Sequence, residues 1–310
     1  MKSGAAEILY SSLAERGLRG RVISVHRLQE LKDEIARYQI NGALDGEFSR
    51  EALSHFIFRI PEDFPSAASL IIIAMPRPQT RVSFVFCGKP VSLILPPIYL
   101  RFKTIHRQIV SILGELLSLD GYTAITARLP QKLLAVRSGL AEYGRNNISY
   151  ISGMGSFFQL AVFFSDFPCP EDHWIEPRMM AKCENCRSCV NNCPTGALTE
   201  SRFLLKGERC LVFHNERSSE HPFPEWIDAN WHNSLLGCML CQRICPENNN
   251  FLEWFEGNQE FSEEESSLIV TGVSPDKFPP ETREKLKNLG LLDYIDFLPR
   301  NLSVFRMRQS

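Results

Sequence analysis

The sequence predicts an α+β protein in three parts: a larger mixed domain, a cysteine-rich segment and a short helical tail. Helical and strand patterns alternate over residues 1–166, and eight of the ten cysteines fall between residues 183 and 245. We place the three parts at residues 1–176, 177–255 and 256–310. With 310 residues, of which 44% are hydrophobic and 23% charged, the chain is typical of a globular protein with about two domains.

Three segments have the composition of buried strands. The run LIIIAM (residues 70–75) favours a central strand covered on both faces, because its β-branched residues are consecutive. The run SFVFCGKPVSLIL (residues 83–95) predicts a hairpin whose strands join at Gly88-Lys89-Pro90. The run SFFQLAVFFSD (residues 156–166) predicts a further buried strand. The pattern does not give the order of the strands in a sheet.

Three segments have helical patterns. Pro96-Pro97 is expected to open a helix whose apolar positions recur with helical spacing from Phe102 to Leu116. A second helix is expected from Gln131 to about Leu140. In the tail, PPETREKLKNLG predicts a helix that ends at Gly290 as its cap. Together the elements predict an α/β or α+β sandwich in the first part of the chain.

The cysteines form two groups with the spacing of iron–sulfur ligands. The first group reads C-x2-C-x2-C-x3-C-P, which is the ligand run of bacterial ferredoxins. Its members are Cys183, Cys186, Cys189 and Cys193, followed by Pro194. The second group consists of Cys210, Cys238, Cys241 and Cys245, followed by Pro246. Cys87 and Cys169 lie outside both groups, and we expect a buried core thiol and a loop thiol, respectively.

The ferredoxin spacing predicts which cysteines bind the same cluster. Three cysteines two residues apart can direct three thiolates from one loop at three irons, whereas the fourth ligates the other cluster. One [4Fe-4S] cluster is therefore predicted on Cys183, Cys186, Cys189 and Cys245. The other is predicted on Cys193, Cys210, Cys238 and Cys241, where Cys210 replaces the missing first cysteine of the run. The alternatives are structural zinc sites or disulfides, but zinc ribbons do not need the two C-x3-C-P endings.

Charge and hydropathy restrict the partners. The chain has 34 basic and 36 acidic side chains, which argues against a broad nucleic-acid-binding face. No run approaches the ~18 apolar residues that a membrane span requires, and the N-terminus carries charges where a secretory signal has an apolar core. We therefore expect a cytoplasmic protein that does not associate with membranes. Neither a G-x-G-x-x-G nor a P-loop motif is present, so no dinucleotide or P-loop nucleotide site is indicated.

Residues 137–166, RSGLAEYGRNNISYISGMGSFFQLAVFFSD, together with both cysteine groups, resemble the epoxyqueuosine reductases and their relatives. These are cobalamin-dependent iron–sulfur reductases, similar in architecture to reductive dehalogenases. The resemblance covers roughly residues 65–249. It implies a nitroreductase-like domain over residues 1–176 that holds base-off cobalamin, followed by a ferredoxin-like domain with two [4Fe-4S] clusters. In such enzymes the clusters reduce the corrinoid, which then removes oxygen or halogen from the substrate.

The resemblance also implies the residues that contact the cofactor. The family's Gly-Leu-Gly-aromatic-Ile-Gly-Lys-Asn segment falls on residues 139–146, where Ala141 replaces glycine and Arg145 replaces lysine. The implied contacts are Gly139, Gly144, Arg145, Asn146, Asn147, Gly155, Ser156, Phe157 and Phe158. Small residues would admit a flat macrocycle, and Arg145 could bind the nucleotide phosphate. The alternative is that Gly139 and Gly144 only end a helix and turn the chain.

One departure from the family concerns the catalytic acid. The family has an Asp-x-x-Pro segment ahead of the glycine loop, whereas Ala127-Arg128-Leu129 precedes Pro130 in this sequence. Tyr143 or Glu142 is the substitute proton donor that the sequence offers, although a packed tyrosine and a surface glutamate are the simpler interpretations. The long helical-repeat tail of many tRNA-acting relatives is also missing, which weakens the case for a tRNA substrate.

The sequence leaves the substrate and the electron donor open. An epoxide, a halide or a modified nucleoside would suit a reductase, with a low-potential ferredoxin or flavodoxin as the external donor. A non-enzymatic electron carrier or an activase that reduces a partner's corrinoid is a second interpretation. A flavin enzyme with a ferredoxin arm is a third. The bound organic cofactor distinguishes the three, because a carrier should bind none and a flavin enzyme should bind FMN.

Overall fold

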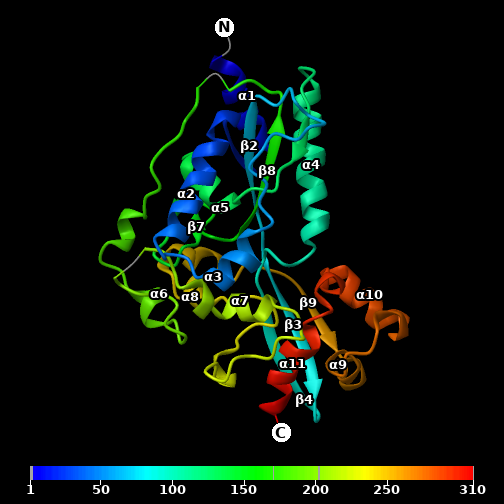
Figure 1. The fold of residues 1–310 in the computed structure, drawn as a ribbon. Helices are drawn as coiled ribbons and strands as arrows, with labels where there is room; N and C mark the ends of the chain where they lie inside the picture. The colour runs from blue at the N-terminus through cyan, green and yellow to red at the C-terminus, as the bar shows by residue number, and fades with distance from the viewer. Residues whose placement is uncertain (1–2, 170, 202, 310) are drawn as a thin grey trace. The chain divides into compact units, whose positions relative to one another are not determined.

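The computed structural model describes residues 3–169, 171–201 and 203–309, and Figure 1 traces the chain. The chain divides into two compact units, each assembled from separate segments. Unit 1 comprises Met1–Pro76, Thr104–Arg187 and Glu200–Glu208. Unit 2 comprises Arg77–Lys103, Ser188–Thr199 and Arg209–Ser310. These units differ from the predicted division at residues 176 and 255, because the hairpin that begins at Gln79 belongs with the tail.

Unit 1 contains a four-stranded antiparallel sheet with the order β1-β2-β8-β5. The strands of this unit are β1 (Arg19–Ser24), β2 (Ser69–Pro76), β5 (Ala124–Thr126), β6 (Glu142–Tyr143), β7 (Ser149–Tyr150) and β8 (Phe158–Ser165). The helices are α1 (Ser3–Glu15), α2 (Leu28–Ile40), α3 (Gly46–Phe48), α4 (Phe102–Ser118) and α5 (Gln131–Arg137), with a π-helical turn at Ser49–Leu53. The mixed α+β class predicted for this part is confirmed.

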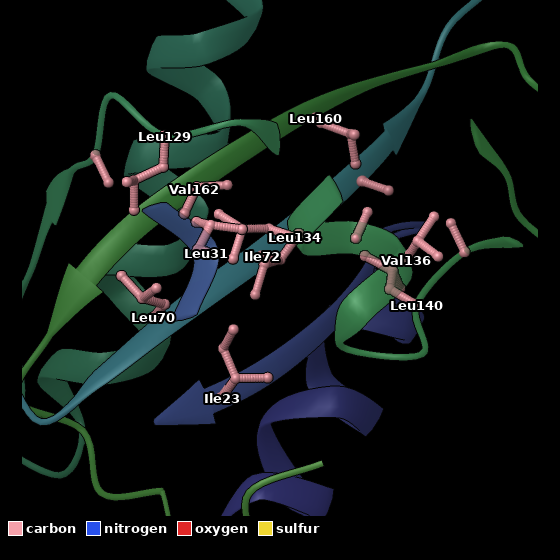
Figure 2. Close-up of a cluster of buried hydrophobic side chains, with 14 of the residues drawn as sticks. Ile23, Leu31, Leu70, Ile72, Leu129, Leu134, Val136, Leu140, Leu160 and Val162 are labelled. Atoms are coloured by element: carbon pink, nitrogen blue, oxygen red, sulfur yellow. The ribbon is translucent and has the colours of Figure 1, made fainter. Parts of the chain in front are cut away.

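The central strand β2 is buried on both faces, as its sequence predicts. Leu70, Ile72 and Ala74 belong to the core cluster drawn in Figure 2, together with side chains from α2, α5 and β8. Ile71 and Ile73 point to the opposite face and pack in a second cluster with α1 and α4. Because alternate residues of a strand face opposite sides, one apolar run supplies both cores.

Helix α4 confirms the predicted apolar stripe but begins later than expected. Ile105, Ile109 and Leu113 are buried against the sheet. The residues after Pro97 form turns instead of helix, and Arg101 has a φ of 51°, which lies outside the right-handed helical region. The helix therefore starts at Phe102, whose side chain is 38% exposed.

Unit 2 contains a three-stranded sheet with the order β4-β3-β9. Its strands are β3 (Gln79–Phe86), β4 (Lys89–Leu95) and β9 (Phe255–Phe261). Its helices are α6 (Ser188–Asn191), α7 (Leu211–Glu216), α8 (Leu240–Arg243), α9 (Glu263–Val270), α10 (Pro280–Leu289) and α11 (Leu298–Met307). Short 3-10 segments lie along the chain at Val25–Arg27, Ala181–Cys183, Gly207–Arg209, Ala229–Trp231, Pro246–Phe251, Pro275–Lys277 and Leu291–Tyr294.

The predicted hairpin is confirmed, but its turn lies one residue earlier. Cys87 and Gly88 both have positive φ angles, 51° and 73°, and Lys89 already pairs with Phe86. This is the backbone that a two-residue hairpin turn requires. The expectation of a buried core thiol at Cys87 is therefore wrong, because the residue is exposed at the turn. Cys169 lies in a loop, as expected.

The tail is not wholly helical, because it begins with β9. This strand pairs in parallel with β3, and the Phe261 ring stacks on the Phe84 ring at 4.8 Å. The sequence did not indicate β9, because most of its residues are polar. Helix α10 confirms the prediction for the tail, and Gly290 ends it with a φ of 74°. Within the described ranges, no helix is long and apolar enough to cross a membrane.

Candidate functional site

The glycine loop, residues 139–147, follows α5 in unit 1 and includes β6 and the turn that leads to β7. Gly139 ends α5 with a φ of 70°, and its N–H donates to the carbonyl of Val136 at 3.0 Å. Gly144 and Asn147 close the turn, because the Asn147 N–H donates to the Gly144 carbonyl at 3.0 Å. Asn147 adopts a φ of 56°, a left-handed conformation that asparagine tolerates better than most residues.

The chain's own side chains fill the space beside two of the predicted glycines. A Cβ on Gly144 would lie 2.5 Å from both Asn146 Oδ1 and a ring carbon of Tyr150. A Cβ on Gly139 would lie 2.9 Å from His173 Nε2. The structure therefore explains these two glycines by internal packing. The expectation that they leave room for a flat macrocycle is not needed to account for them.

Arg145 connects the glycine loop to the first two cysteines of the ferredoxin run. Its Nη2 donates to the Cys183 carbonyl at 2.8 Å, and its Nε lies 3.2 Å from the carbonyls of both Cys183 and Cys186. Nη2 also lies 3.4 Å from the Glu184 carbonyl. The guanidinium thus holds the backbone of the loop that carries Cys183 and Cys186, whereas the sequence had suggested a phosphate as its partner.

A second segment, residues 203–207, packs on the glycine loop within unit 1. The Phe203 ring meets the Tyr143 ring edge to face at 5.3 Å. The N–H of Leu205 donates to Asn147 Oδ1. This segment lies between Cys193 and Cys210 in the sequence. The chain between two predicted cluster ligands therefore returns to the glycine loop.

Buried polar side chains occur in the loop and in the segments that follow it. Asn146 and Asn147 in the loop, and Ser149, Ser156 and Gln159 later in the chain, are each no more than 6% exposed. Asn146 is satisfied, since its Nδ2 donates to the Tyr150 hydroxyl at 2.9 Å and its Oδ1 accepts from the Ile148 N–H. Asn147 Nδ2 is buried and has no hydrogen-bond partner among the described residues. A buried donor without an acceptor is uncommon in native proteins and points to a ligand or a water molecule.

The second predicted contact segment lies where the chain enters β8. Gly155 accepts a hydrogen bond from the Ile151 N–H at 3.0 Å and has a φ of 57°. Phe157 is fully enclosed, and Phe158 packs in the core cluster of Figure 2. The protein itself surrounds both rings. Contact between this segment and a cofactor stays a prediction.

The two proposed proton donors differ in their surroundings. Glu142 is half-exposed and forms an ion pair with Arg178 at 3.2 Å. Burial raises the pKa of Tyr143 well above its usual range, and the nearby Glu34 and Tyr38 add to this, whereas Arg137 opposes it. Tyr143 therefore keeps its proton throughout the physiological pH range.

Sequence reasoning missed a buried ion pair beside Tyr143. Arg137 Nε and Nη2 donate to Glu34 Oε2 at 3.0 and 2.8 Å, and the two residues are 6% and 3% exposed. Arg137 Nη1 also donates to the Ile175 carbonyl. A signal was present in α2, because Glu34 follows the buried Leu28 and Leu31 at three-residue intervals. A carboxylate on an apolar helix face needs a buried cation.

Unit 2 contains the four predicted ligands of the second cluster, Cys193, Cys210, Cys238 and Cys241. Burial raises the pKa of the Cys241 thiol well above its usual range, and Cys238, Cys210, Cys189 and Cys193 add to this by their charge. Because Cys189 is assigned to the first cluster, these interactions do not separate the two predicted ligand sets. Burial also raises the pKa of Cys238, while hydrogen bonds from Asn233 and the Leu240 backbone oppose the shift.

The predicted ligands of the first cluster are divided between the units. Cys183 and Cys186 belong to unit 1, and Cys189 and Cys245 belong to unit 2. This assignment stays a prediction. Over the described ranges, no three His, Cys, Asp or Glu side chains converge as ligands of a single metal ion. In unit 2, Trp226 is 39% exposed and lies beside Arg209 and His214.

Sequence comparison identifies the cysteine-rich segment. Residues 182–248 match a family described as the 4Fe-4S double cluster binding domain, which supports two [4Fe-4S] clusters. An epoxyqueuosine reductase from Atelocyanobacterium thalassa is 30% identical over 126 residues, 41% of this chain and 40% of that protein. One from Escherichia coli (strain K12) is 32% identical over 123 residues, 40% of this chain and 31% of that protein. The matches thus span less than half the length of these relatives.

Structural comparison extends the similarity to nearly the whole fold. Epoxyqueuosine reductase from Bacillus subtilis superposes with a TM-score of 0.68 at 20% identity, covering 96% of this chain and 80% of that chain. The enzyme from Streptococcus thermophilus gives 0.65 at 16% identity, with the same coverage. The chain is therefore similar to epoxyqueuosine reductases in its fold, and its cysteine-rich part matches a double-cluster domain.

Proposed function

We propose that the protein is a cobalamin-dependent iron–sulfur reductase that cleaves a carbon–oxygen bond in an epoxyqueuosine-like substrate. One observation carries the proposal: Arg145, in the loop expected to contact the cofactor, binds the backbone carbonyls of Cys183 and Cys186. A cofactor beside this loop would lie next to ligands of the first cluster. Short separation between donor and acceptor is what electron transfer into a cofactor requires.

The glycine loop offers a donor for a polar group of the cofactor. Asn147 Nδ2 is buried and has no hydrogen-bond partner within the described part of the chain, so an acceptor on a bound molecule would satisfy it. Its neighbour Asn146 is also polar and buried, which suits the amide-rich rim of a corrinoid. When bound, cobalamin supplies a strongly reducing cobalt centre. In this proposal the N-terminal part is a nitroreductase-like domain that holds the corrinoid with its lower base detached.

Tyr143 is the proposed proton donor. Removal of an epoxide oxygen as water consumes two electrons and two protons, so the site needs a group that holds a proton at neutral pH. A tyrosine hydroxyl is protonated there at its ordinary pKa of 10.0, and burial raises the pKa of Tyr143 further, which keeps the proton in place but makes the hydroxyl a weaker acid. Glu142 is the weaker candidate, because Arg178 pairs with its carboxylate and solvent reaches it. A catalytic aspartate loop is named for the Bacillus subtilis enzyme, whereas residues 127–129 of this chain contain no carboxylate.

The proposed substrate is a modified nucleoside or a small epoxide. The relatives are named epoxyqueuosine reductases, and one solved structure contains an epoxyqueuosine-modified tRNA-Tyr stem loop. Electrons are proposed to come from a low-potential ferredoxin or flavodoxin in the cytoplasm, through the two clusters. Binding of a whole tRNA is not favoured, because the chain has 34 basic and 36 acidic side chains.

The test starts with anaerobic purification, analysis of iron and sulfide, and optical titration with cobalamin. We expect about eight irons per chain and a spectrum of cobalamin whose lower base is detached. The loaded, reduced protein is then mixed with an epoxyqueuosine-containing stem loop, and the deoxygenated nucleoside is measured by mass spectrometry. Eight irons without cobalamin binding would overturn the proposal, and bound FMN would indicate the flavin enzyme instead.

A further inference from the structure

Asn233 directs a side-chain N–H at a predicted cluster ligand in unit 2. Its Nδ2 lies 3.2 Å from Cys238 Sγ, within hydrogen-bond distance for sulfur. The same Nδ2 donates to the Trp231 carbonyl at 3.1 Å, and Oδ1 accepts from the Met239 N–H at 3.2 Å. These two backbone partners fix the orientation of the amide, since a flipped amide would place a donor against an N–H. The second Nδ2 hydrogen is therefore left for the sulfur.

Thr195 makes a comparable contact with another ligand of the same predicted cluster. Its Oγ1 lies 3.5 Å from Cys193 Sγ, and the residue is 2% exposed. A thiolate has no proton to donate, so in a cluster-bound state the hydroxyl must be the donor. Two of the four predicted ligands of the second cluster thus have a neutral side-chain donor, which is buried at Thr195 and partly buried at Asn233.

Hydrogen bonds to cluster sulfurs change the reduction potential. Reduction adds negative charge that spreads onto the thiolates, so a donor stabilises the reduced cluster more than the oxidised one. Partial burial of both contacts strengthens the effect, because less water competes for the sulfur. We propose that Asn233 and Thr195 are positioning residues that raise the reduction potential of the second [4Fe-4S] cluster through Cys238 and Cys193. The proposal rests on the cysteine assignment and does not require a corrinoid.

The chain offers near-isosteric variants for the test. Thr195→Val removes the hydroxyl with little change in shape, and Asn233→Leu removes both amide functions. Asn192→Leu is the matched control, because the Asn192 Nδ2 donates to the Leu240 carbonyl and not to a sulfur. Cys238→Ser identifies the second cluster's redox transition, since it alters a ligand of that cluster alone.

Each anaerobically purified, full-length variant is analysed for iron and then by protein-film voltammetry without cobalamin or substrate. We expect full iron content in Thr195→Val and Asn233→Leu, with the second cluster's transition moved to a more negative potential. At a fixed applied potential the ratio of reduced to oxidised second cluster should fall about three- to tenfold for each variant. The double variant should show the sum of the two shifts. The other cluster and the Asn192→Leu control should be unchanged.

Three results would overturn the proposal. Full iron content with an unmoved second transition would mean that the contacts do not tune the cluster. Equal shifts in both transitions, or a shift in Asn192→Leu, would indicate a general change in the protein. Loss of iron from both near-isosteric variants would assign Asn233 and Thr195 a purely structural role. Because no organic cofactor is used, a failure of cobalamin binding leaves this test intact.

Discussion

Arg145 Nη2 lies 2.8 Å from the carbonyl oxygen of Cys183, so a cation of the glycine loop holds the backbone of a predicted cluster ligand. A planar guanidinium can serve two carbonyls at once, as Arg145 does with Cys183 and Cys186. The contact therefore supports both the shape of the loop and its place beside Tyr143.

Replacement of Arg145 tests this contact. We expect Arg145→Met to weaken the Cys183 loop by about 1.5–3 kcal/mol, the range for hydrogen bonds that involve a charged group. The first cluster should then be lost preferentially, so that anaerobic iron analysis gives about four irons per chain instead of about eight. Arg145→Lys should retain an intermediate amount, because an ammonium is a point donor. Full iron content in Arg145→Met would contradict the role.

The sequence predicted elements well where local signals decide the structure. The run at residues 70–75 correctly predicted a strand that is buried on both faces, and Gly290 correctly predicted the end of α10. Strand β9 could not be predicted, because its backbone pairs with β3 from far along the chain and four of its seven residues are exposed. Hydrogen bonding between backbones does not require a particular pattern of side chains, so the sequence does not indicate it.

The residues of the candidate site stay a prediction, and the contacts that they make could not be predicted from the sequence. Arg145 was noticeable in the sequence because it is a cation in a glycine-rich loop. Its partners are backbone carbonyls, however, and since every residue has a carbonyl, the sequence does not indicate which ones it binds. The ion pair of Glu34 and Arg137 joins positions 103 residues apart, so only the burial of Glu34's helix face could have indicated it. The cysteines were easier, because their chemistry fixes their spacing.

The Glu34–Arg137 pair should contribute strongly to stability. We expect Glu34→Gln to lower the free energy of unfolding by about 3–5 kcal/mol, because it leaves the buried Arg137 charge without its main partner. Urea denaturation of the anaerobic protein, followed by tryptophan fluorescence, measures the change. Glu30→Gln is the control on the same helix, since Glu30 is half-exposed and its pair with Arg27 should contribute less than about 1 kcal/mol. Equal losses in the two variants would contradict the expected effect of burial.

Removal of the Tyr143 hydroxyl should separate catalysis from cofactor binding. We expect Tyr143→Phe to bind iron and cobalamin like the unaltered protein, because the ring and its packing on Phe203 are preserved. Turnover of the epoxyqueuosine-containing stem loop should fall about 10²–10⁴-fold, the usual contribution of a general acid. Unchanged turnover in Tyr143→Phe would mean that another group is the proton donor, and Glu142→Gln is then the next variant to test.

Tyr143 also predicts a dependence of stability on high pH. Its pKa is raised in the folded protein above the ordinary value of 10.0, so the unfolded chain ionises first. The contribution of Tyr143 to stability is therefore complete below pH 10 and is lost as the pH rises above it. Denaturation of the unaltered protein and Tyr143→Phe side by side should show a steeper alkaline decline in the former. Parallel declines would mean that the folded protein does not raise the pKa of Tyr143.

The surroundings of His232 predict that the stability of the protein falls at acidic pH. Burial lowers its pKa from 6.5 to about 4, and Arg308, Arg300 and His214 add to the shift by their charge. The unfolded chain takes up a proton first, so stability should fall as the pH drops from 6.5 to 4, by on the order of 3 kcal/mol. His232→Gln should remove this part of the decline. His221→Gln is the control, because His221 is exposed and should leave the acidic decline unchanged.

Helix α11 should be required for the second cluster, because it fixes the chain between Cys210 and Cys238. Arg300 donates to the carbonyls of Ser218, His221 and His214 at 3.1, 2.6 and 2.8 Å. Asn301 donates to the carbonyls of Asn215 and Leu235 at 2.8 and 2.9 Å. All five acceptors lie between the two ligands.

Arg300→Met should therefore free this chain and release the second cluster, leaving about four irons per chain. Arg300 is half-buried, and burial lowers its pKa to about 10, so it is charged at neutral pH and its loss leaves three carbonyls without their donor. Met307→Gln serves as the control on the same helix, because Met307 is 65% exposed. Anaerobic iron analysis and voltammetry distinguish the outcomes. Retention of eight irons and both transitions in Arg300→Met would show that Cys210 and Cys238 hold the cluster without help from α11.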